Sequence, residues 1–342
     1  MRATAALAAA ALMGLVVAAK IASGRTPPED PASAERSIAE ADAHYALRAE
    51  GHVGARAASL EISEAIAGYE RAAVDPRNAE ARWKLARALY FLGTYTSLSD
   101  AERTAAFARA RRFGEDAIGI VGRRKGNARI RSVSPDAAAG IAAGDPDAAA
   151  SYFWTAVAWG QWALASGRFE AARQGAADRI RDDCATLIRL DPKFEEGGGY
   201  RILGRLHDQA PRIPLLTGWV SRSEALRNLR LSVELAPANF VNRHFLAEAL
   251  HKGDRAQKEE AIRLEEQVAG DTPSEARLVE ELALQDQARA NLASWKPGRS
   301  AASRKSYGSR ISVSCLASSP TFTSSVFAIT ATANAFAGTI RR

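Results

Sequence analysis

The glycine-rich run from Gly197 to Gly204 is the first place in this sequence where chemistry could occur. It follows two adjacent carboxylates, Glu195 and Glu196, and its spacing resembles a degraded phosphate-binding loop. The lysine and the serine or threonine of a true phosphate-binding loop are missing, and no strand is predicted before the glycines. We therefore interpret Gly204 as a position where two helices touch, and we expect the two carboxylates to be solvated in a loop.

Two histidines are the next candidates, because imidazoles that share a helix face can hold a metal ion. His244 and His251 are seven residues apart and share a face, but this spacing is too long for chelation of one ion, so packing or surface roles are favoured. The chain has no spaced set of histidine, cysteine and carboxylate ligands and no nucleophile motif. The sequence therefore predicts a protein that is not an enzyme, with no catalytic residue, no metal and no cofactor.

A tryptophan cluster is the third candidate. Trp154, Trp159 and Trp162 are half of the six tryptophans and lie between Tyr152 and Gly167. Trp159 and Trp162 are i, i+3 neighbours on one helix face, whereas Trp154 lies to one side of it. One interpretation is core packing against the next helix. The other is the wall of a site for an apolar ligand, because rigid aromatic rings beside small residues line pockets well.

Helices have to position these residues, and the stretch from Ser223 to Gly253 indicates how. It matches the 34-residue tetratricopeptide template, with twelve positions from Ala225 to Pro237 and ten from Pro237 to Ala247. The fold class we predict is all-α, a tetratricopeptide-like stack of antiparallel helix hairpins, or α-solenoid. The predicted repeat contact positions are Ala86, Gly204, Ala225, Pro237 and Ala247.

The predicted repeat domain extends over residues 34–295. Its basic stretch from Arg123 to Pro146 is expected to be a solvated connector, and we assign it no role. The helical segments that the periodicity predicts are Ala34 to Val74, Ala79 to Gly93, Asp100 to about Ile120, Tyr152 to Gly167, Ala171 to Leu190, Ser223 to Gly253 with its turn, Ala261 to Pro273, and Glu275 to Trp295.

The composition agrees with close helix packing and argues against a nucleic-acid partner. The chain is 47% hydrophobic but only 7% aromatic, with alanine as the filler. Residues 297–342 contain six positive charges and no acidic residue. The rest of the chain has 40 basic and 39 acidic residues. A body of net charge +1 lacks the basic surface of a nucleic-acid binder. Cys184 and Cys315 make no disulfide framework, and we expect Cys184 to be a small buried side chain.

The two ends of the chain differ from the repeat domain. Residues 1–24 read as a secretory signal peptide, with Met1-Arg2, an apolar run to Ala19 and a small-residue cleavage site at Ala22-Ser23-Gly24. This pattern predicts export to the periplasm, and an uncleaved inner-membrane anchor is the alternative. Residues 296–342 are of low complexity, and we interpret them as a disordered or foreign extension.

Four segments together resemble one family, the TatT-type periplasmic components of TRAP transporters. The most specific of these is the GG-x-x-R-x-L-G pattern at Gly198, Gly199 and Arg201 to Gly204. The resemblance covers roughly residues 34–295. Its four segments are Ala108 to Ile118, Tyr152 to Ala163, Asp191 to Arg205 with the loop containing Pro211 and Pro214, and Ala236 to Leu250.

The resemblance implies an all-α protein that associates with a TRAP solute-binding protein and holds an apolar or organic-acid ligand in a channel through the helical stack. The lipoprotein cysteine of some relatives is absent, so anchoring through it is not implied. A general tetratricopeptide scaffold for protein–protein interaction is the alternative function, and a homo-oligomer stays open. The candidate channel residues implied by the resemblance are Trp154, Trp159, Arg201, Pro211, Pro214 and Trp219.

Overall fold

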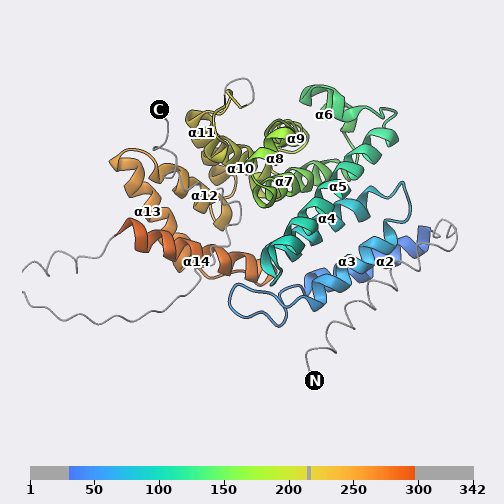
Figure 1. Cartoon of the computed structure of the whole chain (residues 1–342), viewed down its shortest axis with the longest axis horizontal. Helices are drawn as coiled ribbons and strands as arrows, with labels where there is room; N and C mark the ends of the chain where they lie inside the picture. The colour runs from blue at the N-terminus through green and yellow to red at the C-terminus, as the bar shows by residue number, and fades with distance from the viewer. Residues whose placement is uncertain (1–30, 214–216, 297–342) are drawn as a thin grey trace, which may run out of the picture.

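The computed structural model describes residues 31–213 and 217–296 (Figure 1). This part of the chain folds into thirteen α-helices, α2 to α14, without strands, which confirms the predicted all-α helical stack. Our predictions for the signal peptide, for Pro214 and for all but the first residue of the tail lie outside the described residues.

The helix bounds follow several of the predicted segments, and α6 and α10 lie outside all of them. The bounds are α2 Pro31–Ala46, α3 Leu60–Ala72, α4 Ala79–Tyr95, α5 Asp100–Arg124, α6 Pro135–Ala142, α7 Ala148–Ser166, α8 Arg168–Arg173, α9 Ala176–Leu190, α10 Phe194–Gln209, α11 Arg222–Leu235, α12 Phe240–His251, α13 Arg255–Gly270 and α14 Leu278–Trp295, with the 3₁₀ turns η1 Ile130–Ser132 and η2 Glu275–Arg277.

Successive helices pair as hairpins, and the first helices of the hairpins form the inner layer of the stack. The pairs are α2 with α3, α4 with α5, α7 with α9, α10 with α11, and α12 with α13, and α14 packs on α13. Helices α4, α7, α10, α12 and α14 also contact one another in that order. In a curved stack of helix hairpins, the helices that contact the equivalent helix of the next hairpin lie on the concave side. We call α2, α4, α7, α10, α12 and α14 the inner helices.

The last inner helix returns to the first hairpin and closes the stack. The Nη2 atom of Arg48, just after α2, lies 2.8 Å from a carboxylate oxygen of Glu280 on α14, and the same guanidinium donates to the carbonyl of Ala276. Val279 belongs to one buried cluster with Ala41 and Ile62. Figure 1 shows α14 running from α13 towards the connection between α2 and α3. The inner helices therefore form a closed ring.

Two predicted helices are each divided in the structure. The segment from Ala34 to Val74 contains α2 and α3, separated by a connection in which Gly51 and Gly54 have φ of +67° and +56°. The helix predicted to begin at Ala171 is interrupted at Gly175, whose φ is +65°, and becomes α8 and α9. Positive φ ends a right-handed helix, and glycine adopts it at little cost.

The basic stretch from Arg123 to Pro146 is not the solvated connector that we expected. Helix α5 continues through Arg124, and α6 packs against α9 with three buried alanines. Ile130 is 1% exposed, and Arg131 Nη1 lies 3.1 Å from a carboxylate oxygen of the buried Asp183. The many cations indicated a solvated segment, but most of them lie on the exposed side. The apolar residues between them are buried on the other side.

The predicted contact positions lie at helix junctions. Ala86, Ala225 and Ala247 are buried, and Pro237 is exposed in the turn between α11 and α12. A Cβ atom on Gly204 would lie 2.7 Å from Cγ and 3.0 Å from the backbone nitrogen of Leu229 on α11. The absence of a side chain there allows α10 and α11 to approach this closely.

Candidate functional site

The inner helices bring polar and aromatic side chains together in the middle of the ring. We call this set the central cluster. Aromatic contacts join α4 to α7, with 5.9 Å between the ring centroids of Tyr90 and Trp154. A hydrogen bond joins α10 to α12, from Arg201 to Asn242. The members of the central cluster are Tyr45 of α2, Tyr90 and Tyr95 of α4, Trp154 of α7, Glu195 and Arg201 of α10, Asn242 of α12 and Glu280 of α14.

The three tyrosines of the central cluster remain neutral hydroxyl groups. Burial raises the pKa of Tyr90 to about 12 and raises the pKa of Tyr95 well above its usual value. Their hydroxyl oxygens are 3.3 Å apart. Burial also raises the pKa of Tyr45, against the opposing charges of Arg87 and Arg48 and with smaller contributions from Glu280 and Glu195. Carboxylates from α14 and α10 therefore act on a ring from α2, as expected where the inner helices converge.

Arg201 is the buried cation of the central cluster. Its side chain is part of a residue only 8% exposed, and burial lowers its pKa. Nη1 donates to the carbonyl of Glu195 at 3.1 Å and to Oδ1 of Asn242 at 2.9 Å. Among the described residues no carboxylate forms an ion pair with it, and its Nε and Nη2 atoms make no hydrogen bond. A buried guanidinium with free donors can bind an anion.

Three consecutive residues at the start of α10 have left-handed backbone conformations. The φ angles are +49° for Glu195, +59° for Glu196 and +80° for Gly197. Each non-glycine residue in this region costs on the order of 1–3 kcal/mol. Asn242 fixes this left-handed turn by donating to the carbonyl of Glu196 at 3.0 Å, and Arg277 lies 3.0 Å from the Glu196 carboxylate.

The turn separates the roles of the two adjacent carboxylates. The Glu196 carboxylate accepts hydrogen bonds from Asn239 and Arg277, while its side chain stays 45% exposed to solvent. Glu195 is exposed, and within the described part of the chain its carboxylate has neither a hydrogen bond nor an ion pair. Glu195 is thus an available negative charge beside Arg201.

The glycines after the turn serve close packing. A Cβ on Gly198 would lie 2.5 Å from the ring of Phe153, and one on Gly199 would lie 2.8 Å from the side chain of Ile188. The run therefore lets α10 approach α7 and α9. This contact accounts for the glycines without a phosphate, in agreement with our rejection of a phosphate-binding loop.

The structure brings Trp154 and Arg201 into the central cluster but places Trp159 elsewhere. Trp159 lies about 140° around the helix from Trp154, as five residues of separation dictate. Its Nε1 donates to Glu115 on α5 at 3.0 Å, and its ring meets that of Trp162 edge to face. The guanidinium of Arg111 lies 4.3 Å and 4.1 Å from the centroids of these two rings. Trp159 therefore packs α7 against α5.

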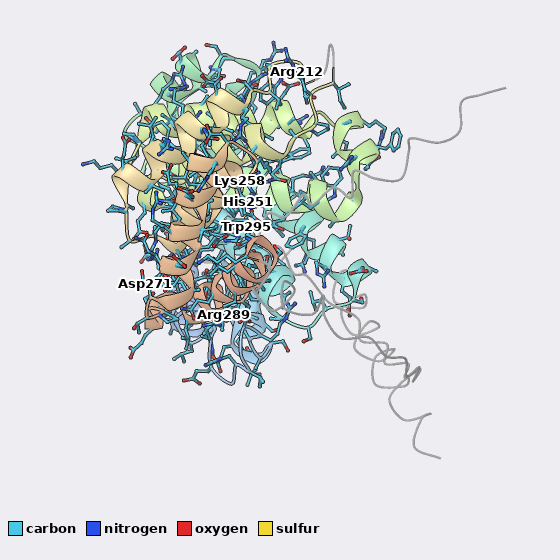
Figure 2. All side chains as sticks on the ribbon, turned by 90° about the vertical axis from the view of Figure 1, so that its left-hand side faces the viewer. Arg212, His251, Lys258, Asp271, Arg289 and Trp295 are labelled. Carbon is cyan, nitrogen blue, oxygen red and sulfur yellow. The ribbon has the colours of Figure 1, made fainter. Side chains whose placement is uncertain are left out.

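The predicted loop residues lie apart from the central cluster as well. Pro211 is exposed, and Trp219 donates from Nε1 to Asp178 on α9 at 3.1 Å. Trp219 lines an open groove of about 560 Å³, at the end of the molecule where Figure 2 labels Arg212. The groove is formed by Arg212, Gly218, Trp219, Val220, Ser221, Arg222 and Ser223.

A second set of charged side chains, the C-terminal network, joins four helices. His244 on α12 is fully buried, with Nδ1 3.1 Å from the carboxylate of the equally buried Glu265 on α13. Arg205 on α10 lies 2.5 Å from Glu248, and Asn291 on α14 donates to Glu265 at 2.7 Å. His244 thus has the packing role that its sequence position predicts. His251 stacks on Trp295 with 3.9 Å between ring centroids, and the two are labelled side by side in Figure 2.

Sequence reasoning missed Tyr45, Tyr90, Glu195 and Glu280 as site residues. Tyr90 lies inside the predicted segment from Ala79 to Gly93, where periodicity shows only that it is on a helix. The other three become neighbours only when the ring closes, 85 to 235 positions apart in the chain. No local pattern marks such a set.

Residues 31–213 and 217–296 contain no group of three or more histidine, cysteine, aspartate and glutamate side chains that could hold a metal ion. None of the helices in these ranges is both long and apolar enough to cross a membrane. No protein-family model matches the chain, and no curated protein is significantly similar to it.

Proposed function

We propose that this chain is a non-enzymatic binding protein that holds a small organic solute bearing a carboxylate in the middle of its ring of inner helices. We propose further that it is exported and assists TRAP-type uptake through a solute-binding protein. The observation that carries the first proposal is Arg201, a buried cation with two free donor nitrogens among aromatic rings. The transport role is supported by the resemblance of the four sequence segments.

The aromatic rings explain why an organic rather than an inorganic anion is proposed. Tyr90 and Trp154 are only half-buried although they lie on inner helices, and Phe153 stands 5.8 Å from the guanidinium of Arg201. Rings of this kind bind the apolar part of a ligand, while one charged group fixes its orientation. The tyrosine hydroxyls add neutral hydrogen-bonding groups at the same place.

Isothermal titration of the purified protein with straight-chain and branched carboxylates tests the binding proposal. We expect saturable binding of at least one of them, and a loss of about tenfold or more in the Arg201→Met variant, because a hydrogen bond to a charged group contributes about 1.5–3 kcal/mol. Equal affinity of both proteins, or no binding of any solute, would refute it. Co-purification with a TRAP solute-binding protein tests the transport role separately.

The open groove beside Trp219 favours a second candidate, a scaffold that binds a segment of another protein. Its lining combines an exposed arginine pair, Arg212 and Arg222, with one tryptophan face. Tryptophan and arginine are the residues that most often dominate protein interfaces. Cross-linking from a cysteine placed at Ser223 would capture a protein partner in this case, and Trp219→Ala would abolish the cross-link.

A further inference from the structure

Two aromatic rings of the central cluster lie at the boundary between the two largest hydrophobic clusters of the fold. Tyr90 on α4 and Trp154 on α7 pack against both clusters, and among the described residues no other partly buried apolar side chain does so. Neither ring is fully buried, although both lie on inner helices. The two hydrophobic clusters therefore do not close over these rings, and part of each ring is open to a ligand.

The faces of these two rings are not covered by other flat or charged groups. The centroids of Tyr90 and Trp154 are 5.9 Å apart with the planes inclined at 44°, and Phe153 meets Trp154 edge to face at 4.9 Å. Among the described residues, no ring stacks parallel to Tyr90 or Trp154 and no cation lies over them. Trp159, by contrast, has the guanidinium of Arg111 4.3 Å from its centroid.

The indole nitrogen of Trp154 is also without a partner. Trp83, Trp159 and Trp219 each donate from Nε1 to a carboxylate at 3.0 or 3.1 Å, which fixes each ring to another segment. Trp154 Nε1 makes no hydrogen bond within the part of the chain that the structure describes. A buried indole N–H usually finds an acceptor. Trp154 thus offers both an open ring and a free donor.

Arg201 reaches the same rings from α10. Its guanidinium carbon lies 5.8 Å from the centroid of Phe153, whose ring contacts that of Trp154. Phe194, at the start of α10, adds a further half-buried ring 5.6 Å from that of Phe153. The row of rings from Phe194 through Phe153 and Trp154 to Tyr90 therefore begins beside the free donors of Arg201.

We propose that the ligand of the central cluster is an aromatic carboxylate, whose carboxylate binds Arg201 and whose ring lies against Trp154 and Tyr90. This inference rests on the proposed function and specifies its ligand class. Aromatic rings attract one another in edge-to-face and offset contacts, and this attraction adds to the gain from burying apolar area. An alkyl carboxylate would gain only the burial. An oxygen atom of the ligand supplies the acceptor that Trp154 Nε1 lacks.

Matched pairs of acids separate aromatic contact from apolar burial. 3-Phenylpropanoate and 3-cyclohexylpropanoate share one carbon skeleton, and phenylacetate with cyclohexylacetate and benzoate with cyclohexanecarboxylate repeat the comparison with shorter links. A saturated ring buries at least as much apolar area, so burial alone would favour the cyclohexyl acid. Isothermal titration of the full chain near pH 7 should instead show that the phenyl acid of at least one pair binds about fivefold or more tightly.

Substitutions locate the source of this preference. Trp154→Leu should bring the two acids of the pair to within about twofold of each other, and Tyr90→Leu should reduce the preference by about twofold or more. Phe169→Leu on α8 is the control that should keep the full preference, because Phe169 is 96% exposed and outside the central cluster. Circular dichroism checks the helical content, and if Trp154→Leu loses it, Tyr90→Leu decides.

The outcomes distinguish the ligand class from the proposed function. If each cyclohexyl acid binds as tightly as its phenyl partner, the aromatic ligand is refuted and the proposed function stands. A phenyl preference that survives both Trp154→Leu and Tyr90→Leu also refutes it, because the preference then arises elsewhere. If none of the six acids binds, the aromatic ligand is refuted, and the proposed function falls with it only when straight-chain and branched carboxylates fail as well.

Discussion

The central cluster and the C-terminal network use the same residue types in opposite ways. In the C-terminal network His244 is bonded to Glu265, and Arg205 is paired with Glu248, so every cation has an anion beside it. In the central cluster Arg201 and Glu195 have no such partners within the described residues. A buried charge that is paired inside the protein holds helices together, whereas one that is left free is available to a ligand.

The difference follows from the positions of the two regions in the stack. The C-terminal network lies between layers, where α10, α12, α13 and α14 pack on one another and every side chain meets a neighbour. The central cluster lies where side chains of six inner helices meet. Tyr45, Tyr90 and Trp154 keep partial exposure there, whereas Tyr95 is only 3% exposed. Stability and binding are therefore expected to respond to different substitutions.

The largest effect is expected from removing one partner in the C-terminal network. Glu265→Gln removes the nearer of the two carboxylates beside the buried His244 and leaves Glu248 at 3.8 Å, so the free energy of unfolding should fall by about 3 kcal/mol. Urea denaturation at pH 6 measures this, with Glu64→Gln as the control that should change little. If the free energy of unfolding fell by less than about 1 kcal/mol, the paired charges of the C-terminal network would not hold the helices together. Solute binding by the folded fraction should be unchanged.

A smaller effect should appear when the pH is raised. Burial alone would lower the pKa of His244, but Glu265 and Glu248 outweigh it and raise the pKa above 6.5, against the opposing charge of Arg205. The protonated form is thus favoured in the folded state. Its contribution to stability is complete below pH 6.5 and is lost as the pH rises through the raised value. Denaturation curves from pH 6 to 9 should show this decline, and Glu265→Gln should flatten it.

Arg201→Met should weaken solute binding and hardly change stability, whereas Glu265→Gln should lower stability and leave binding unchanged. The substitution takes the Nη1 donor away from two acceptors, Oδ1 of Asn242 and the carbonyl of Glu195. It also removes the desolvation cost of a buried cation that has no carboxylate partner, so the net stability change should stay within about 1 kcal/mol. Binding of a carboxylate solute should nevertheless be lost. The measurement is urea denaturation and calorimetric titration of the same preparation. A stability loss comparable to that of Glu265→Gln would assign Arg201 to structure instead of binding.

The smallest effect is expected at the ion pair between Arg277 and Glu196, which anchors the left-handed turn. Both side chains are more than 40% exposed, so solvent screens their attraction. Glu196→Gln, which leaves the pair between Arg277 and the buried Glu281 in place, should lower the unfolding free energy by less than about 1 kcal/mol, measured against the wild type in 0.15 M salt. High salt should remove most of the difference. A salt-independent loss would contradict the screened pairing.

The sequence by itself determined the class of fold and much of its internal spacing. Alanine and glycine at helical intervals, with Asp-Pro and Ala-Pro turns, are local patterns, and they sufficed for the helical stack and for the contact at Gly204. The tryptophan cluster drew attention to Trp154, and the resemblance of the four segments named Trp154 and Arg201. Local pattern sufficed for the helices and their contacts because helix periodicity and repeat spacing depend on residues a few positions apart.

Only the tertiary structure decided which side chains meet. Periodicity placed Trp154 and Trp159 on different faces of one helix but could not decide which face turns inward, because that depends on how the neighbouring helices pack. It did not reveal that Glu280 reaches the first hairpin through Arg48, a contact across 232 positions. Nor did it show that two glutamates adopt left-handed conformations beside glycines around which α7, α9 and α11 pack. Ring closure is a long-range property, and the candidate site exists only because of it.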